Sequence, residues 1–181
     1  MKKIMFNDKY GLTQAVLEGR KTQTRRTFLK SGEETLLDGI TPEYLISVRS
    51  RYKVGETVAI AQPYADITPQ VDWVKCMIRK ETLGWNNKMF VRAEDMPHHI
   101  RITKIRIERL QDIKSEDCLK EGLWRSGDVG LEGTTYWYHG LSNSSFRTPQ
   151  EAYASLIDRI SGKGTWASNP YVFVYEFELI N

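Results

Sequence analysis

Alternating apolar and polar positions predict a long strand over residues 99–110. The alternation changes parity inside that run, because Ile102 falls on one face and Ile105 on the other. One extra residue near 103–104 restores the alignment, so we predict a β-bulge or a sharp coil there. Bulges of this kind bend strands and help to curve sheets into barrels.

Shorter apolar runs predict the remaining strands. The run 57–61 is apolar on both faces, which favours a central strand of a closed sheet. The run 171–179 alternates and places its aromatic residues on one side. Weaker strand signals lie at residues 4–6, 71–78 and 89–91.

Caps and helical spacing of apolar residues predict the helices. A full capping box, Thr148-Pro149-Gln150-Glu151, opens a helix that ends at Gly162. The helical spacing predicts an apolar face that packs on the core, made of Ala152, Tyr153, Leu156, Ile157 and Ile160. A threonine followed by proline opens a short helix over residues 42–47. An amphipathic run over residues 12–18 ends at Gly19, because glycine adopts the left-handed conformation that closes a helix.

A very short helix is predicted between Ser115, as its N-cap, and Gly122, which stops it. Glu121 is then the last helical residue, although a carboxylate is unfavourable at the negative end of the helix dipole. The residue is either a surface glutamate or one retained for function, and the pattern leaves both open.

Residues 124–147 are rich in glycine, serine, threonine and aromatic residues, which predicts a long ordered loop or lid. Tyr136-Trp137-Tyr138 is its expected anchor, either by packing in the core or by stacking on bases. The order of elements indicates a mixed α+β domain around a curved or closed sheet.

Composition and charge restrict the classes of function. The chain of 181 residues fits one domain, and its net charge of +3 neither requires nor excludes a nucleic acid. Cys76 and Cys118 are too few for a disulfide scaffold, and His98 and His99 point to opposite faces of a strand, so no metal or other cofactor is expected. No signal peptide or membrane span is visible, which predicts a cytoplasmic protein without membrane partners or an evident obligate protein partner.

Residues 19–26, Gly-Arg-Lys-Thr-Gln-Thr-Arg-Arg, combine cations and hydroxyls without a carboxylate. Such donors suit a phosphate, an oxyanion or a carbonyl under attack. A desolvated lysine can act as base for a hydroxyl nucleophile, so Lys21 and Thr24 are candidates for those roles. Strand alternation separates two sets, Thr22, Thr24 and Arg26 against Lys21, Gln23 and Arg25. A solvated basic run at a helix end accounts for the same residues.

Four motifs taken in order resemble the ASCH domain of the PUA-like superfamily: Gly19-Arg20-Lys21-Thr22-x-Thr24-x-Arg26, Tyr52-x-Val54-Gly55-Glu56, Arg109-Leu110-Gln111-Asp112-Ile113 and Glu121-Gly122. The closing segment 169–177 is similar to the last strand of phage- and prophage-associated members. The resemblance covers nearly the whole chain, with expected insertions at about 27–50 and 66–82. It implies one domain over 1–181, built as a small, mostly antiparallel β-barrel with flanking helices and a cleft at one end.

The resemblance also implies a ligand, a nucleoside or RNA. Family members include amidohydrolases that remove acetyl from N(4)-acetylcytidine, and others reported as ribonucleases or treated as RNA-binding modules. The amidohydrolases use a lysine, a threonine and a glutamate, which Lys21, Thr24 and Glu121 match here. Three functions therefore stay open: an acyl-nucleoside amidohydrolase, a non-catalytic reader of RNA or a modified base, and a ribonuclease.

Expected substrate-binding residues come from two places, Thr22, Arg25 and Arg26 in the first motif and Gln62 and Tyr64 after the strand 57–61. Many phage-associated members carry Arg-Glu-x-Trp at the second place, where this chain has Ala-Gln-Pro-Tyr. A neutral amide and an apolar residue replace a charged pair, so substrate contacts there are expected to differ. Tyr64 either stacks on a base or packs in the core.

Overall fold

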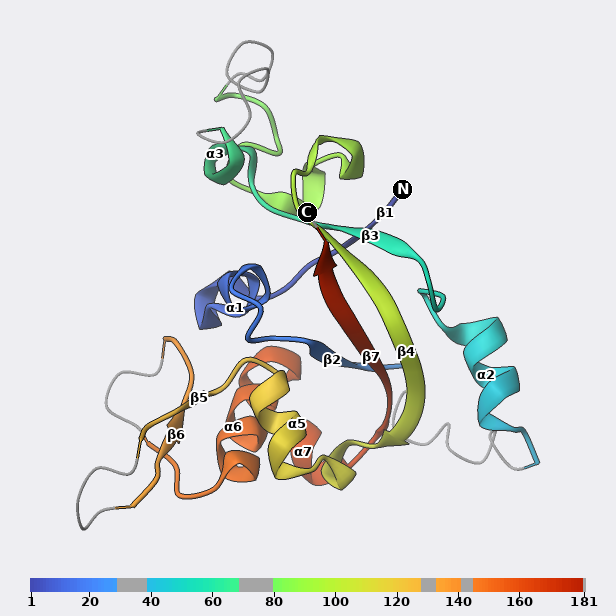
Figure 1. The fold of residues 1–181 in the computed structure, drawn as a ribbon, viewed down its shortest axis with the longest axis vertical. Coiled ribbons are helices and arrows are strands. Elements are labelled where there is room, and N and C mark those ends of the chain that lie inside the picture. Colours follow the sequence, from blue (N-terminus) through green and yellow to red (C-terminus); the bar gives the residue numbers. More distant parts are fainter. Residues whose placement is uncertain (29–38, 69–79, 128–132, 141–144, 181) are drawn as a thin grey trace.

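The computed structural model describes residues 1–28, 39–68, 80–127, 133–140 and 145–180. Its centre is a five-stranded sheet in the order β1 (Lys2–Ile4), β3 (Thr57–Ile60), β4 (His99–Arg109), β7 (Tyr171–Ile180) and β2 (Gln23–Thr27) (Figure 1). The β1–β3 pair is parallel and the other pairs are antiparallel. A separate two-stranded ribbon joins β5 (Trp124–Arg125) and β6 (Tyr136–Trp137).

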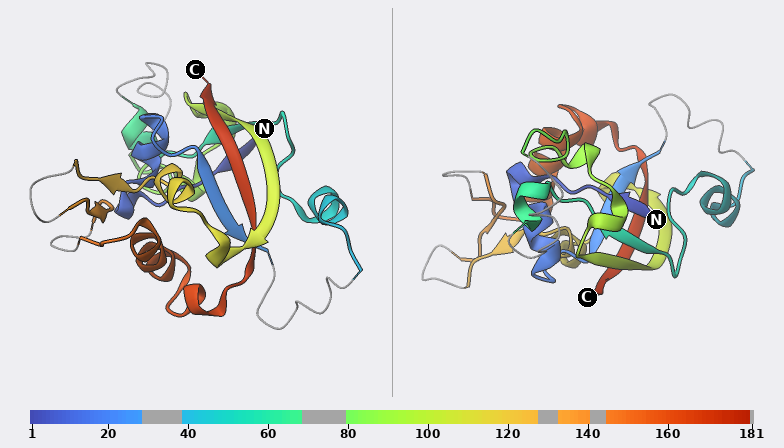
Figure 2. Two further views of the ribbon diagram at one scale, coloured as in Figure 1. Left: turned by 60° about the horizontal axis from the view of Figure 1, so that its bottom comes forward. Right: turned by 90° about the horizontal axis from the view of Figure 1, so that it is seen from above.

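The mixed α+β class and the mostly antiparallel sheet are confirmed, and of the two predicted forms, curved or closed, the described residues show the curved one. β1 and β2 lie at opposite ends of the strand order and do not pair with each other. β1 spans only three residues, so little edge is available for closure. The sheet is therefore open but strongly curved, as the long bent strands β4 and β7 show (Figures 1 and 2).

The predicted bulge in the long strand is confirmed. The register of β4 against β7 runs without interruption up to Ile102 opposite Phe177 and then shifts, with Lys104 opposite Glu176. The extra residue, Thr103, changes the parity of the isoleucines and lets both halves of the strand face the core. β4 and β7 thus form a continuous bent pair that supports the shorter strands.

The helices gather mainly at one end of the sheet. α5 (Ser115–Lys120), α6 (Pro149–Ser161) and α7 (Thr165–Ser168) pack together beside β2 and β7, whereas α2 (Pro42–Arg49) lies apart from them (Figures 1 and 2). The remaining helical segments are α1 (Leu12–Leu17), α3 (Tyr64–Ile67) and the 3-10 turns η1 (Asp8–Tyr10), η3 (Lys88–Phe90), η4 (Ala93–Asp95) and η5 (Leu110–Asp112). No helix in the described ranges combines the length and the hydropathy needed to cross a membrane.

Three helix predictions are confirmed in their cap geometry. The Thr148 side chain accepts from the Glu151 amide while Glu151 reaches back to the Thr148 amide, which completes the capping box of α6. Thr41 caps α2, and Gly19 follows α1 with a φ of +73°. Four of the five predicted apolar positions of α6 are buried, and Ile160 is exposed.

Two local predictions are wrong. Residues 88–90 form the 3-10 turn η3 instead of a strand, because the Asn87 side chain accepts the Met89 amide and closes a turn. Lys114 is the N-cap of α5, and Ser115 is its first helical residue. The Ser115 hydroxyl bonds the Gln150 side chain instead of capping the helix. The predicted strand at 71–78 lies outside the described residues.

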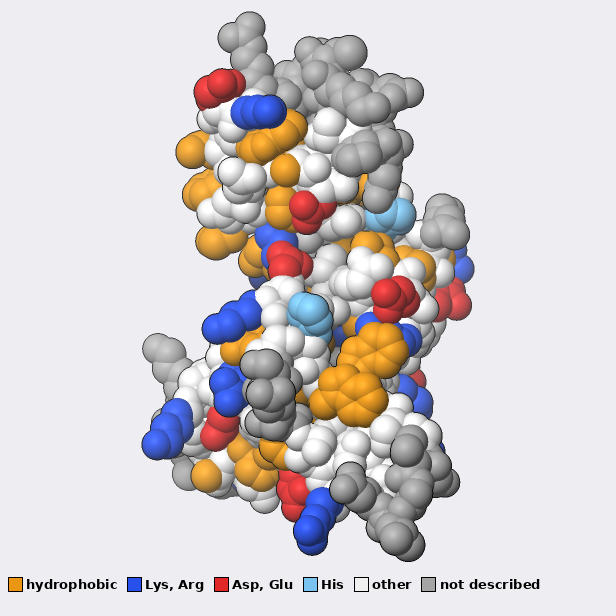
Figure 3. Space-filling view, turned by 90° about the vertical axis from the view of Figure 1, so that its left-hand side faces the viewer, with side chains coloured by type: hydrophobic (Ala, Val, Ile, Leu, Met, Phe, Trp, Pro, Cys, Tyr) orange, Lys and Arg blue, Asp and Glu red, His pale blue; other side chains and the backbone are white. Residues whose placement is uncertain are grey.

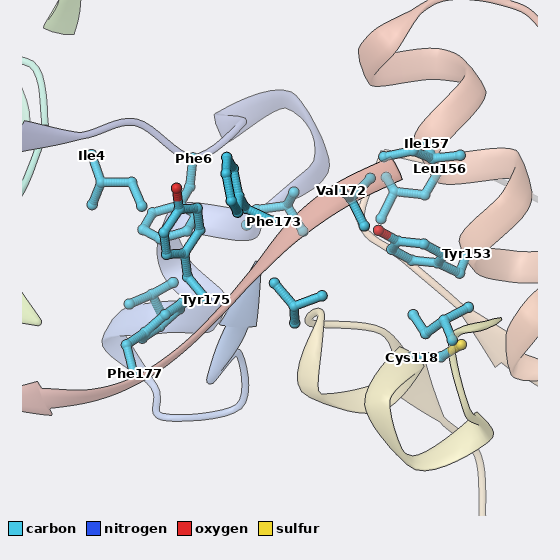
Figure 4. Packing of buried hydrophobic residues seen from close by; sticks show 14 of the residues in the cluster. Ile4, Phe6, Cys118, Tyr153, Leu156, Ile157, Val172, Phe173, Tyr175 and Phe177 are labelled. Atoms are coloured by element: carbon cyan, nitrogen blue, oxygen red, sulfur yellow. The ribbon is translucent and has the colours of Figure 1, made fainter. Parts of the chain in front are cut away.

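The main hydrophobic core fills the space between the sheet and the helices α1, α5 and α6. Figure 4 shows Phe173, Tyr175 and Phe177 of β7 facing Ile4 and Phe6, while Tyr153, Leu156 and Ile157 of α6 approach the same strand from the other end. Tyr138 is fully buried in this core, so this ring of the predicted aromatic anchor packs rather than stacks on a ligand.

Candidate active site

The segment from Gly19 to Thr24 changes direction before it joins the sheet. The Lys21 amide bonds the Ala15 carbonyl and the Thr22 amide bonds the Lys120 carbonyl, so both residues precede β2, which begins at Gln23. Strict strand alternation therefore does not extend back to Lys21. This break brings the Lys21 side chain to the cavity that Thr24 also lines, although their spacing in a regular strand would separate them.

Lys21 and Glu121 form a buried ion pair. Lys21 Nζ lies 2.5 Å from Glu121 Oε2 and 2.9 Å from the Glu121 carbonyl oxygen. Only 2% of Lys21 and 4% of Glu121 is exposed. Burial lowers the pKa of Lys21, and the Glu121 carboxylate opposes that effect without cancelling it. The lysine is therefore easier to deprotonate than an exposed one.

Glu121 also binds Arg25, whose guanidinium is fully buried. Arg25 Nη1 lies 2.9 Å from Glu121 Oε1, and its Nε donates to Glu108 Oε1 at 2.8 Å. A weaker contact of 3.4 Å reaches Asp117 Oδ2. Burial acts against the charged form, but Glu121, Tyr153 and Glu108 outweigh it, so the pKa of Arg25 lies above its ordinary value. Arg25 thus remains a cation that holds the Glu121 carboxylate in place.

A layer of further charges surrounds Arg25. Arg106 bonds Asp117 at 2.9 Å, Glu108 at 3.0 Å and also Glu176. Gln23 donates to Asp117 Oδ1 at 3.1 Å and accepts from Arg25 at 3.3 Å. Because Arg25, Arg106 and Asp117 each bond at least two other side chains, the position of Glu121 is fixed by a network rather than by one contact.

Lys21, Thr24 and Glu121 all line one cavity of about 490 Å³. Its remaining wall is mostly apolar and comes from the segment before η1, the starts of α1 and η5, the helix α6 and the start of β7: Phe6, Leu12, Leu110, Leu156, Ile157 and Val172 among others. A volume of this size and a lining that combines an apolar wall with converging polar side chains are typical of small-molecule sites. Within the described residues no hydrogen bond joins Thr24 to Lys21, and the Thr24 hydroxyl is available to a ligand.

Tyr153 is a polar residue of the cavity that the sequence pattern assigned to the core. It belongs to the apolar face of α6, and its ring extends toward Val172 of β7 (Figure 4). Burial and the nearby Glu121 carboxylate raise the pKa of its hydroxyl, so it stays protonated and able to donate. Its helical spacing matched a core position, and only the proximity of Glu121 in space distinguishes it.

The five predicted substrate-binding residues do not all line the cavity. Arg25 and Arg26 both line the cavity. The Arg25 guanidinium is bound to carboxylates, whereas Arg26 is exposed and has one bond from its Nη2 to the Met5 carbonyl at 2.5 Å. Thr22 is half-buried before β2 and does not line the cavity.

Gln62 and Tyr64 do not line the cavity either. Tyr64 packs in a second hydrophobic cluster with Ala61 and Met96, and its hydroxyl donates to Asp95 at 2.6 Å. Its ring faces Gly84, where a Cβ would come within 2.5 Å of it. Gln62 is buried beside them, and its side-chain carbonyl has no hydrogen-bond partner in the described part of the chain.

The described residues contain no group of three or more histidine, cysteine or acidic side chains able to hold a metal ion. The carboxylates near the cavity, Glu108, Asp117 and Glu121, are each bound to basic side chains. The chemistry available here is that of a buried lysine, a hydroxyl and a fixed carboxylate.

The chain matches no protein-family model, and the comparison with curated proteins finds no match. Among solved structures it is similar to the crystal structure of protein EF3133 from Enterococcus faecalis V583, of family-model DUF984. That likeness has a TM-score of 0.42 at 16% identity and covers 99% of this chain and 80% of that chain. A TM-score of this size carries no argument about function, so the site must be interpreted from its own geometry.

Proposed function

We propose that this protein is an amidohydrolase that removes an acyl group from an N(4)-acylated cytidine or a closely related acylated nucleoside. The observation that carries the proposal is the convergence of Lys21, Thr24 and Glu121 on one cavity with an apolar wall. The order of motifs supports it, because the sequence resembles ASCH domains whose amidohydrolases use the same three residue types. The apolar wall suits the face of a base, and the polar end suits an amide carbonyl.

The hydrogen bonds of Lys21 suggest how it acts as a base. A neutral amine has two N–H donors and one lone pair, whereas an ammonium has three donors and none. Glu121 offers two acceptors to Lys21 Nζ, its carboxylate at 2.5 Å and its backbone carbonyl at 2.9 Å. With both N–H groups bound there, the lone pair is left for a group in the cavity. Glu121 is thus the residue that orients the base.

In the proposed reaction, neutral Lys21 takes the proton of the Thr24 hydroxyl while Thr24 Oγ1 attacks the acyl carbon. The bond from that carbon to the exocyclic nitrogen then breaks, and Lys21 returns the proton to the departing cytosine amine. The acyl group remains as an ester on Thr24. Water, deprotonated by Lys21, attacks the ester, and the carboxylic acid leaves as Thr24 recovers its proton.

The proposal is tested by mixing the purified protein with a panel of acylated nucleosides and measuring the release of nucleoside and acid. We expect turnover by the wild type, and its loss in Lys21→Ala and Thr24→Ala. Thr24→Ser keeps a hydroxyl and should retain part of the activity. Absence of turnover across the panel contradicts the proposal for this substrate class.

Two other activities are distinguished by the same protein preparations. A non-catalytic reader predicts salt-dependent RNA affinity that depends on arginines and is indifferent to Thr24→Ala. A ribonuclease predicts strand cleavage in an RNA ladder assay with and without added divalent metal. Either result without amide hydrolysis replaces the proposal.

A further inference from the structure

A second cavity of about 300 Å³ adjoins the candidate active site, and Met5, Arg26 and Thr27 line both. It lies between the end of α2, the β1 strand and the edge of the sheet at β2 and β7. The two cavities are therefore neighbours, and Arg26 borders both of them.

The second cavity differs from the first in charge. Four cations line it, Lys3, Arg26, Arg49 and Arg51, and no carboxylate does so among the described residues. Arg49 and Arg51 are exposed, and none of the ion pairs within the described chain uses either of them. On the face shown in Figure 3, by contrast, lysine and arginine side chains are interspersed with acidic ones. Among the described residues, four cations therefore gather at this cavity without a carboxylate in its lining.

The floor of the second cavity is aromatic and rigid. Phe28 stacks on Phe173 with ring centroids 4.1 Å apart, and Tyr52 meets Tyr175 edge-on at 5.2 Å. Arg51 lies over the Tyr52 ring at 5.8 Å, and its amide donates to the Tyr175 hydroxyl at 3.3 Å. An apolar floor under a cationic rim strengthens the attraction for an anion, because fewer waters screen it.

The cations do not all serve the same purpose. Lys3 Nζ donates to the carbonyls of Met89 and Val91 at 2.7 and 2.6 Å, which ties β1 to the turn η3. Arg26 uses one nitrogen for the Met5 carbonyl and keeps other donors. The guanidinium groups of Arg26, Arg49 and Arg51 therefore supply the donors for a ligand, and a planar guanidinium matches the oxygens of a phosphate.

We propose that the second cavity binds a phosphate group carried by the ribose of the nucleoside in the first cavity. This inference rests on the proposed function for the placement of the nucleoside. It makes the substrate a nucleotide, either a monophosphate or a residue within an RNA strand, rather than a free nucleoside. The phosphate binds at Arg26, Arg49 and Arg51, and the acyl group points to Lys21 and Thr24.

The experiment is calorimetric titration of the full chain with cytidine, cytidine 5′-monophosphate, cytidine 3′-monophosphate and a trinucleotide with central cytidine. We expect at least one phosphorylated ligand to bind about tenfold or more tightly than cytidine, as one charged hydrogen bond contributes about that factor. A preference for a monophosphate identifies a phosphomonoester, and a preference for the trinucleotide identifies a phosphodiester. Either preference should decline with salt.

Arg49→Gln and Arg51→Gln should each lower the ratio of phosphorylated to unphosphorylated affinity by about tenfold. The matched control is Arg101→Gln, which removes the same charge from β4, where Arg101 forms an exposed pair with Glu178 of β7, and it should leave the ratio unchanged. Both test residues are exposed, so the unfolding midpoint of each variant should equal that of the wild type.

The phosphate site is overturned if all four ligands bind with equal affinity or if none of the phosphorylated ligands binds. It is also overturned if the preference for a phosphorylated ligand persists in the double variant Arg49→Gln/Arg51→Gln. The titration does not depend on turnover. An arginine-dependent preference in a protein that hydrolyses no acylated nucleoside therefore supports the phosphate site while the proposed reaction fails. Hydrolysis of free N(4)-acetylcytidine and its nucleotides with equal kcat/KM supports the reaction while the phosphate site fails.

Discussion

Replacing Glu121 with glutamine removes one negative charge from between two buried cations. The amide oxygen of the glutamine accepts from only one of these cations. Arg25 keeps Glu108 and Asp117 as further partners, whereas Lys21 keeps only the backbone carbonyl of residue 121. The new amide nitrogen also faces a cation with a donor. The cost therefore falls mainly on Lys21, and removal of one partner from a buried pair costs about 3–5 kcal/mol of unfolding free energy.

Urea denaturation at neutral pH measures this cost for Glu121→Gln against the wild type. The matched control, Glu178→Gln, breaks an exposed pair with Arg101 and should cost about 0–1 kcal/mol. Adding Lys21→Met to Glu121→Gln removes the unpaired charge, so the double variant should recover about 2 kcal/mol. A loss in Glu121→Gln no larger than in Glu178→Gln, or no recovery in the double variant, refutes the buried pair.

The loss of unfolding free energy in Glu121→Gln should also depend on pH in a definite direction. Glu121 raises the pKa of Lys21 against the lowering by burial, so its removal lowers that pKa further below the value in the unfolded chain. Between those two pKa values the unfolded state binds more protons, and stability rises with pH. The deficit of Glu121→Gln should thus shrink as the pH rises toward the ordinary lysine value of 10.5. A deficit that is constant with pH contradicts a charged, buried Lys21.

Three further predictions concern separate groups. If the protein hydrolyses acylated nucleosides, kcat/KM should rise with pH to a plateau whose midpoint lies below 10.5, because the base is Lys21 with a lowered pKa; a profile that falls over this range excludes that role. Burial raises the pKa of the Cys118 thiol to about 12. In a Cys76→Ser background, a thiol reagent at pH 8 should therefore label Cys118 quickly in the unfolded protein and hardly at all in the folded protein, and equal labelling rates would contradict its burial. Thr148→Ala should lower the unfolding free energy by about 1 kcal/mol through loss of the capping box, while Thr103→Ala at the exposed bulge should change it by less than half of that; equal losses count against the cap.

Local signals in the sequence predicted most of the elements. The capping box at Thr148, the cap at Thr41 and the parity change after Ile102 each encode a local geometry, and the structure has all three. Closure of the sheet is different, because it depends on whether the edge strands β1 and β2 meet, which no local pattern specifies. The apolar residues of η3 resemble a strand, but the Asn87 side chain closes a turn there.

The site was only partly accessible from sequence. Glu121 drew attention because a carboxylate is misplaced at a helix C-terminus, and in the structure two cations from a distant segment neutralise it. Arg25 was predicted to bind substrate because its carboxylate partners, Glu108 and Asp117, are remote in the chain and no local pattern places them beside it. Tyr153 fitted a core position, and its place beside Glu121 depends on how α5 and α6 pack together.

Attack of Thr24 on the acyl carbon, with Lys21 as base, is measured by the initial rate of cytidine release from N(4)-acetylcytidine and its phosphorylated forms. We predict that Thr24→Ala, folded by circular dichroism, loses activity by about 10³-fold or more relative to the wild type. The control Thr103→Ala should match the wild type. Thr24→Ala and Thr103→Ala releasing cytidine at the same rate would contradict the account.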